Sequence, residues 1–153
     1  MRQALLLFTL LLFVFAVSGL SQGDSEQKTV SIDQILEADA NHNLNVAWQY
    51  FKLRKAYKAV LMRTDETIAA HPTYSKIDEI FYLHGMSSYY LVNGKGKQKL
   101  NLKVLSKEEQ ERFTDNRLQE DALVYLSMLV EEHPESKYVK KAKKILDKIK
   151  PKK

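Results

Sequence analysis

Two stretches of the chain carry the same helical pattern. In residues 67–82 and again in residues 129–142, an amphipathic helical segment ends at a His-Pro pair, a short polar turn follows, and a second amphipathic segment begins. Proline lacks the amide N–H that a helix needs and clashes with the preceding turn, so the first segment ends there. Repeated helix pairs are typical of α-solenoids, which usually present a binding surface. The repeat therefore predicts stacked helical hairpins and favours a binding protein over an enzyme.

Helical spacing of apolar residues extends over most of the chain. Capping boxes at Ser31 with Gln34 and at Ser106 with Glu109 predict two helix starts. The Asn-His-Asn sequence at residues 41–43 is expected to end the first of these helices. No segment alternates with a period of two for long enough to indicate a sheet, so the fold class is all-α, with about five to seven helices. The expected helices span residues 32–40, 44–54, 56–70, 74–91, 107–113 and 117–132, followed by a last helix that ends at Pro151.

The N-terminus resembles a secretory signal peptide. A positive charge at Arg2 precedes an apolar run over residues 4–17, and small residues follow up to Gly23. This order of a basic start, an apolar centre and a small-residue end predicts a signal peptide at residues 1–23. The alternative is an uncleaved membrane anchor, although the run is shorter than the roughly 18–20 residues that span a bilayer comfortably. A signal peptide implies that the mature protein works outside the cytoplasm.

The remainder divides by composition. Residues 24–42 are expected to form a polar linker and a short helix, and residues 43–150 a helical domain with an insertion at residues 92–114. In this domain, Arg54-Lys55 marks a turn, and Asp115 or Asn116 is expected to cap the helix after the insertion. The basic loop at residues 94–106 is long for a compact domain, and such loops often carry function.

Cysteine content and charge limit the chemistry. The chain has no cysteine, which excludes disulfides, thiol chemistry and cysteine acylation within it. The formal net charge is +5, and the nine lysines from Lys137 onward are opposed by Asp147 alone. Such a run suggests an anionic partner. A secreted protein is not expected to bind nucleic acid, so an anionic lipid surface or an acidic protein patch remains. The alternative is a solvated helix end whose lysines suit the helix dipole.

Neither a catalytic nor a metal site is expected. His71 and His133 are equivalent repeat positions at helix ends, and they form no tight ligand spacing with His42 or His84. Adjacent acids fall on polar helix faces, where solvated surface is the simplest interpretation. There is no phosphate-binding glycine loop and no nucleophile motif. We therefore expect no catalytic residues, no metal and no cofactor.

Aromatic residues are dense between residues 48 and 90. Some are adjacent in sequence and point to different sides, so they cannot all face one core. Those left over would line a groove, where tyrosine supplies amphipathic contact area at low entropy cost. The alternative is ordinary helix packing with hydrated hydroxyls. The predicted peptide- or partner-binding residues are Tyr50, Arg54, Tyr82, Tyr89 and Tyr90.

The spacing of residues in the two repeated segments resembles that of two related families. Second-helix positions of a tetratricopeptide (TPR) repeat are matched first by Tyr57 through Pro72 and again by Ala122 through Pro134, with Gly85 at a glycine position expected to contact a neighbouring helix closely. More specifically, residues 121–142 resemble the BamD (YfiO-like) outer-membrane assembly family, which favours a Pro-x-Ser-x-Tyr run followed by alanine. The resemblance covers about residues 45–146. It implies a TPR-like α-solenoid fragment. The chain departs from the family pattern in two ways, because it lacks the N-terminal cysteine that usually carries the lipid and because it has fewer repeats than the family usually has.

The resemblance implies a function in the cell envelope. It suggests a non-catalytic adaptor in the periplasm or at the outer membrane, acting by protein–protein interaction with the machinery that inserts β-barrel proteins, and possible peripheral membrane association. An alternative is an envelope TPR scaffold for peptidoglycan or division factors. A third hypothesis, from a different class, is a small cell-wall enzyme.

Overall fold

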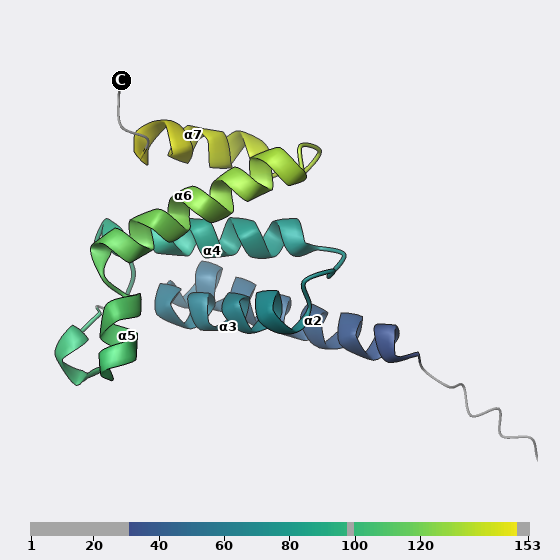
Figure 1. The fold of residues 1–153 in the computed structure, drawn as a ribbon, viewed down its shortest axis with the longest axis horizontal. Helices are drawn as coiled ribbons and strands as arrows, with labels where there is room; N and C mark the ends of the chain where they lie inside the picture. Colours follow the sequence, from purple (N-terminus) through teal and green to yellow (C-terminus); the bar gives the residue numbers. More distant parts are fainter. Residues whose placement is uncertain (1–30, 98–99, 150–153) are drawn as a thin grey trace, which may run out of the picture. The chain divides into compact units, whose positions relative to one another are not determined.

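The computed structural model describes residues 31–97 and 100–149 (Figure 1). The predicted signal peptide lies outside them. Six α-helices occur in these residues, with no strand, which confirms the all-α expectation. None of the described helices combines the length and apolar character needed to cross a bilayer. The elements are α2 (Ile32–Gln49), the π-helix η2 (Tyr50–Arg54), α3 (Tyr57–Ala70), α4 (Ile77–Val92), the 3-10 turn η3 (Leu102–Val104), α5 (Lys107–Arg112), α6 (Asp115–Glu132) and α7 (Val139–Ile149).

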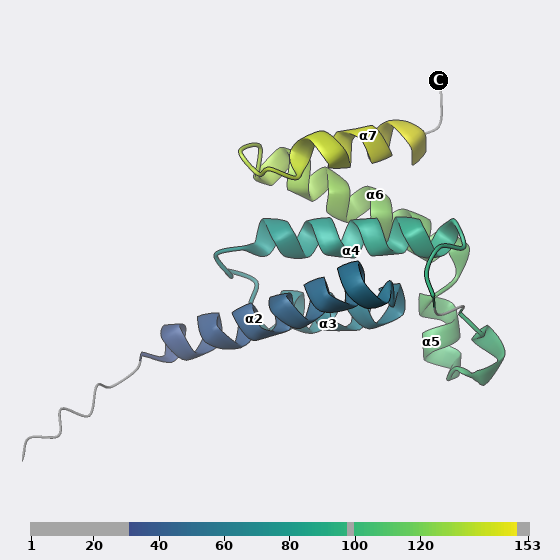
Figure 2. The ribbon, with the colours of Figure 1, turned by 180° about the vertical axis from the view of Figure 1, so that it is seen from behind.

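The long helices form stacked hairpins, as the repeat predicts. α2 packs on α3, α3 on α4, α4 on α6, and α6 on α7, and Figures 1 and 2 show α7 at one end of this order. The short α5 lies to one side of the stack. One apolar core runs through the stack, and fully buried Ile80, Leu83 and Leu126 belong to it. Stacking is needed because a single hairpin cannot bury its own apolar face.

The first helix is longer than expected. α2 runs unbroken through residues 41–43, so the predicted helix end there is wrong. Asn43 is buried against the neighbouring helices, and the amide of Asn41 donates to Glu37 O at 2.8 Å. Asn41 also accepts from the hydroxyl of Tyr74 at 2.9 Å. These tertiary contacts compensate for the weak helix propensity of asparagine. The capping box at Ser31 is present as predicted.

The two His-Pro corners have nearly the same backbone. His71 has φ −135° and ψ 61°, and His133 has φ −129° and ψ 59°. Each histidine amide closes the preceding helix by donating to a carbonyl four residues back, at 2.8 Å for Thr67 and 3.2 Å for Leu129. The prolines lie in turns, and the next helices begin at Ile77 and Val139. The local sequence pattern thus builds the same corner twice.

Gly85 lies where α4 crosses α6. A Cβ atom at this position would be 2.6 Å from Leu126 Cγ and 3.2 Å from the Leu126 amide nitrogen. Such distances are well inside van der Waals contact. Gly85 therefore allows the close helix approach that the sequence predicted, and this approach joins the two repeats.

A second, small core lies where the insertion meets α3 and α6. Phe113 of the insertion packs there with Leu61 of α3 and Leu118 of α6. The basic loop of the insertion contains a 3-10 turn at Leu102–Val104. The capping box at Ser106 is present, whereas Thr114, not Asp115 or Asn116, caps α6, by accepting from the Arg117 amide.

Candidate functional site

An aromatic cluster connects three parts of the stack. It is built by α2 with η2, by α4, and by the corner that precedes α7. The Trp48 ring lies 6.1 Å from Tyr82 and 5.8 Å from Tyr138, and Tyr82 stacks on Tyr138 at 4.3 Å with an interplanar angle of 18°. Phe51 stacks on Tyr90 at 5.8 Å. We call these five residues, Trp48, Phe51, Tyr82, Tyr90 and Tyr138, the aromatic face.

The Glu79 carboxylate accepts hydrogen bonds from two residues of the aromatic face. Glu79 accepts from Trp48 Nε1 at 2.7 Å and from the Tyr138 hydroxyl at 3.0 Å, both on Oε2. Its Oε1 lies 3.5 Å from Lys137 Nζ. Burial, followed by the hydrogen bond to Glu79, raises the pKa of Tyr138 above its usual range. One carboxylate oxygen of α4 therefore accepts hydrogen bonds from both Trp48 of α2 and Tyr138 of the corner before α7, and this fixes the orientation of the two rings.

Lysine ammoniums surround the rings. Lys52 Nζ lies 4.2 Å from the centre of the Trp48 ring, and Lys95 Nζ lies 5.3 Å from that of Tyr90. Lys141 Nζ lies 5.7 Å from Tyr82, whose hydroxyl raises the pKa of Lys141 through a hydrogen bond. Cations at these distances are attracted to ring faces. Apolar rings with flanking cations suit a segment that carries both apolar and acidic side chains.

The five predicted partner-binding residues fall in two places. Tyr82 and Tyr90 belong to the aromatic face, where Tyr82 is buried and Tyr90 is half-buried. Tyr89 contacts Tyr90, with ring centres 5.8 Å apart. Tyr50 and Arg54 form a separate pair, with the guanidinium 5.5 Å from the ring.

Tyr50 and Tyr89 line two different pockets. Tyr50 lines a pocket of about 330 Å³ with Met62 and Glu66 of α3. Tyr89 lines another, of about 230 Å³, with Gln119 and Lys148. The structure therefore does not bring the five residues into a single lining.

Sequence reasoning missed the contribution of the last corner. Tyr138 is absent from the five predicted partner-binding residues, and the lysines near the rings were not connected with the aromatic residues. Tyr138 is distant in sequence from its neighbour Tyr82, so only the stacking of α7 on the preceding helices brings them together. The density of aromatic residues was the available signal, and Trp48 belonged to it.

A second polar cluster lies at the joint between α3, α4 and α6. The His84 side chain is 1% exposed. Its Nδ1 lies 2.9 Å from Thr64 Oγ1, and its Nε2 has no hydrogen-bond partner, with Asp121 Oδ2 at 3.9 Å. Burial lowers the pKa of His84. Among residues 31–97 and 100–149, no three His, Cys, Asp or Glu side chains are placed to hold a metal ion.

Comparison with known proteins identifies the family. The family model YfiO, described as outer membrane lipoprotein, matches residues 40–152, which cover the stack from the middle of α2 through α7. The chain belongs to the YfiO family. The expected resemblance to YfiO-like proteins is thereby confirmed. No curated protein and no solved structure matches the chain significantly.

Proposed function

We propose that this YfiO-family chain is a non-catalytic TPR-type adaptor of the cell envelope, related to the outer-membrane β-barrel assembly machinery. The observation that carries the proposal is the family match, because it extends over nearly the whole helical stack. Stacked helical hairpins present extended surfaces to partners. The family description, outer membrane lipoprotein, supports a location in the periplasm or at the outer membrane.

The aromatic face and its neighbours would bind the partner. Trp48, Tyr90 and Tyr138 are half-buried, and exposed lysines flank them. Aromatic rings that are only half-buried and already packed on one another lose little entropy on binding. We propose that they bind an extended peptide segment of a protein partner, with Tyr89 beside Tyr90 and the separate Tyr50–Arg54 pair as further contacts.

Capture of partners from cross-linked cells tests this function. The full chain would carry a C-terminal tag, and its cross-linked partners would be identified by mass spectrometry. Recovery of an outer-membrane β-barrel protein with soluble N-terminal domains is the expected result. Recovery of peptidoglycan or division proteins without any barrel factor would reject it and favour the envelope scaffold.

Variants test the surface separately. Replacing Tyr89 and Arg54 with alanine should weaken capture of the same partner about tenfold or more, since interface tyrosine and arginine often contribute 1–2 kcal/mol each. Val124→Ala, at an exposed position of α6, is the control and should leave capture unchanged. Tyr82→Ala is not informative, because this side chain is buried and its loss tests folding. Equal capture by the double variant and the control would place the binding surface elsewhere.

A further inference from the structure

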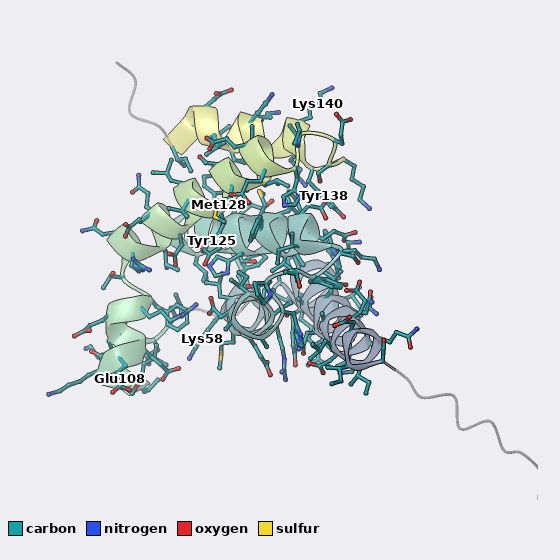
Figure 3. The ribbon with its side chains drawn as sticks, turned by 45° about the vertical axis from the view of Figure 1, so that its right-hand side comes forward. Lys58, Glu108, Tyr125, Met128, Tyr138 and Lys140 are labelled. Carbon is teal, nitrogen blue, oxygen red and sulfur yellow. The ribbon has the colours of Figure 1, made fainter. Side chains whose placement is uncertain are left out.

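The last helix has two sharply different sides. Ala142, Ile145 and Leu146 are buried, and α7 packs with this side on α6. The opposite side carries lysines, and Figure 3 shows Lys140 on the outer side of α7. We define the α7 lysine face as the exposed residues Lys140, Lys143, Lys144 and Lys148.

Several cations elsewhere in the stack form ion pairs, whereas those of the α7 lysine face do not. Lys58 pairs with Glu109 at 2.8 Å, and Arg117 pairs with Glu120 at 3.0 Å. Within the described part of the chain, no ion pair links the α7 lysine face to a carboxylate. The only acid on α7 is Asp147. Positive charge is therefore concentrated at the end of the stack.

The kind of charge indicates the kind of partner. Lysine is a flexible point charge, whereas arginine, with its planar fork, is the usual choice for recognising an individual carboxylate or phosphate. Lysine is also depleted in protein–protein interfaces, where arginine is enriched. Four lysines and no arginine on one helix side therefore suit a diffuse negative surface better than an acidic protein.

We propose that the α7 lysine face docks on a membrane surface rich in anionic phospholipids. Lysines near such a surface are attracted to it individually, and the attraction falls off within a Debye length. The family is described as outer membrane lipoprotein, which supports a membrane surface as the partner of this face.

Vesicle co-sedimentation tests the proposal with the full chain. Binding is compared between vesicles containing phosphatidylglycerol and vesicles of phosphatidylcholine alone, at low and at high salt. The ratio of the two is the readout, because any apolar contribution from residues 4–17 affects both vesicles. Each lysine near the surface is worth about fivefold in affinity. The triple variant K140Q/K144Q/K148Q should therefore lower the ratio about a hundredfold.

A matched variant separates the α7 lysine face from net charge. K97Q/K103Q/K107Q removes the same charge from exposed positions of the insertion, and it should change the ratio less than about fivefold. Circular dichroism would verify that both variants remain helical. Equal loss in both triple variants, or no preference of the parent chain for anionic vesicles at low salt, would overturn the proposal. Binding to polyglutamate without binding to vesicles would also overturn it and assign the face to an acidic protein.

Discussion

The two His-Pro corners share a backbone but differ in what holds them. His71 is buried, and its Nε2 lies 2.9 Å from Oδ2 of Asp39 in α2. His133 is half-exposed, and its ring lies against that of Phe81. At the second corner, Ser136 Oγ donates to Asp78 of α4 at 2.6 Å. Each corner is thus fastened to the helix that precedes its own hairpin in the stack, α2 for the first and α4 for the second.

This difference shows how a repeat becomes a specific structure. The corner pattern is local and is repeated, but the anchoring residues are supplied by another helix and are not repeated. Tyr74 occupies in the first corner the position that Ser136 occupies in the second, and the two use different chemistry to reach the preceding helix. Equivalent positions should therefore respond unequally to substitution.

The largest effect is expected from Tyr74→Ala. The side chain is 3% exposed and its hydroxyl bonds Asn41, so truncation leaves a cavity and should cost about 3 kcal/mol in the free energy of unfolding. Ser136→Ala, at the equivalent position, removes the hydrogen bond to Asp78 and the one that Ser136 Oγ accepts from the Tyr138 amide, but leaves no large cavity, and should cost about 1.5 kcal/mol. Urea unfolding followed by circular dichroism measures both. Equal losses would mean that the corners are anchored alike.

A somewhat smaller effect is expected where the two repeats meet. Gly85→Val would force branched carbons into Leu126 and should destabilise the protein by about 2 kcal/mol, as overpacking does. Leu126→Ala alone should cost about 3 kcal/mol because it leaves a cavity in the core, but the two losses should sum to more than that of the double variant, because the valine fills part of the cavity. A double-mutant cycle in urea measures the coupling. Strictly additive losses would show that Gly85 and Leu126 do not limit the approach of α4 and α6.

A pH-dependent effect is expected at the same joint. Burial lowers the pKa of His84 in the folded protein below its value of 6.5 in the unfolded chain. The unfolded state therefore binds more protons below about pH 6.5, and stability should fall as the pH drops through that value. Asp65, Asp121 and Arg117 also face this site. These three groups are also present in His84→Gln, so the parent should lose more stability than this variant between about pH 8 and pH 5. Parallel pH curves for the two proteins would exclude His84 as the source.

The smallest effect is expected from the phenol of the first corner, Tyr74. Burial, followed by the charge of Glu37, raises the pKa of Tyr74 to about 12. Unfolded tyrosine ionises near pH 10, so the unfolded state loses its proton first and stability should decline above about pH 10. Ultraviolet titration of the parent and of Tyr74→Phe would isolate this phenol. Ionisation of Tyr74 near pH 10 while the helices remain intact would contradict the structure.

Sequence reasoning succeeded where the chemistry is local. Proline ends a helix by its own geometry, a Ser-x-x-Glu or Ser-x-x-Gln segment caps one with its own side chains, and a 3.6-residue apolar period selects a helix. The corners, both capping boxes and the all-α fold of stacked hairpins followed from these rules. Even the close approach at Gly85 was foreseeable, since glycine inside a helix costs about 1 kcal/mol and needs a reason.

Only the tertiary structure decided the features that join distant segments. α2 continues through residues 41–43 because Tyr74 and Lys76 bond Asn41 from the first corner. The aromatic face exists because α7 brings Tyr138 onto Tyr82, and Glu79 becomes a common acceptor for two helices' rings. These contacts depend on how the hairpins stack, and that arrangement results from the burial of the entire core, which no local pattern contains.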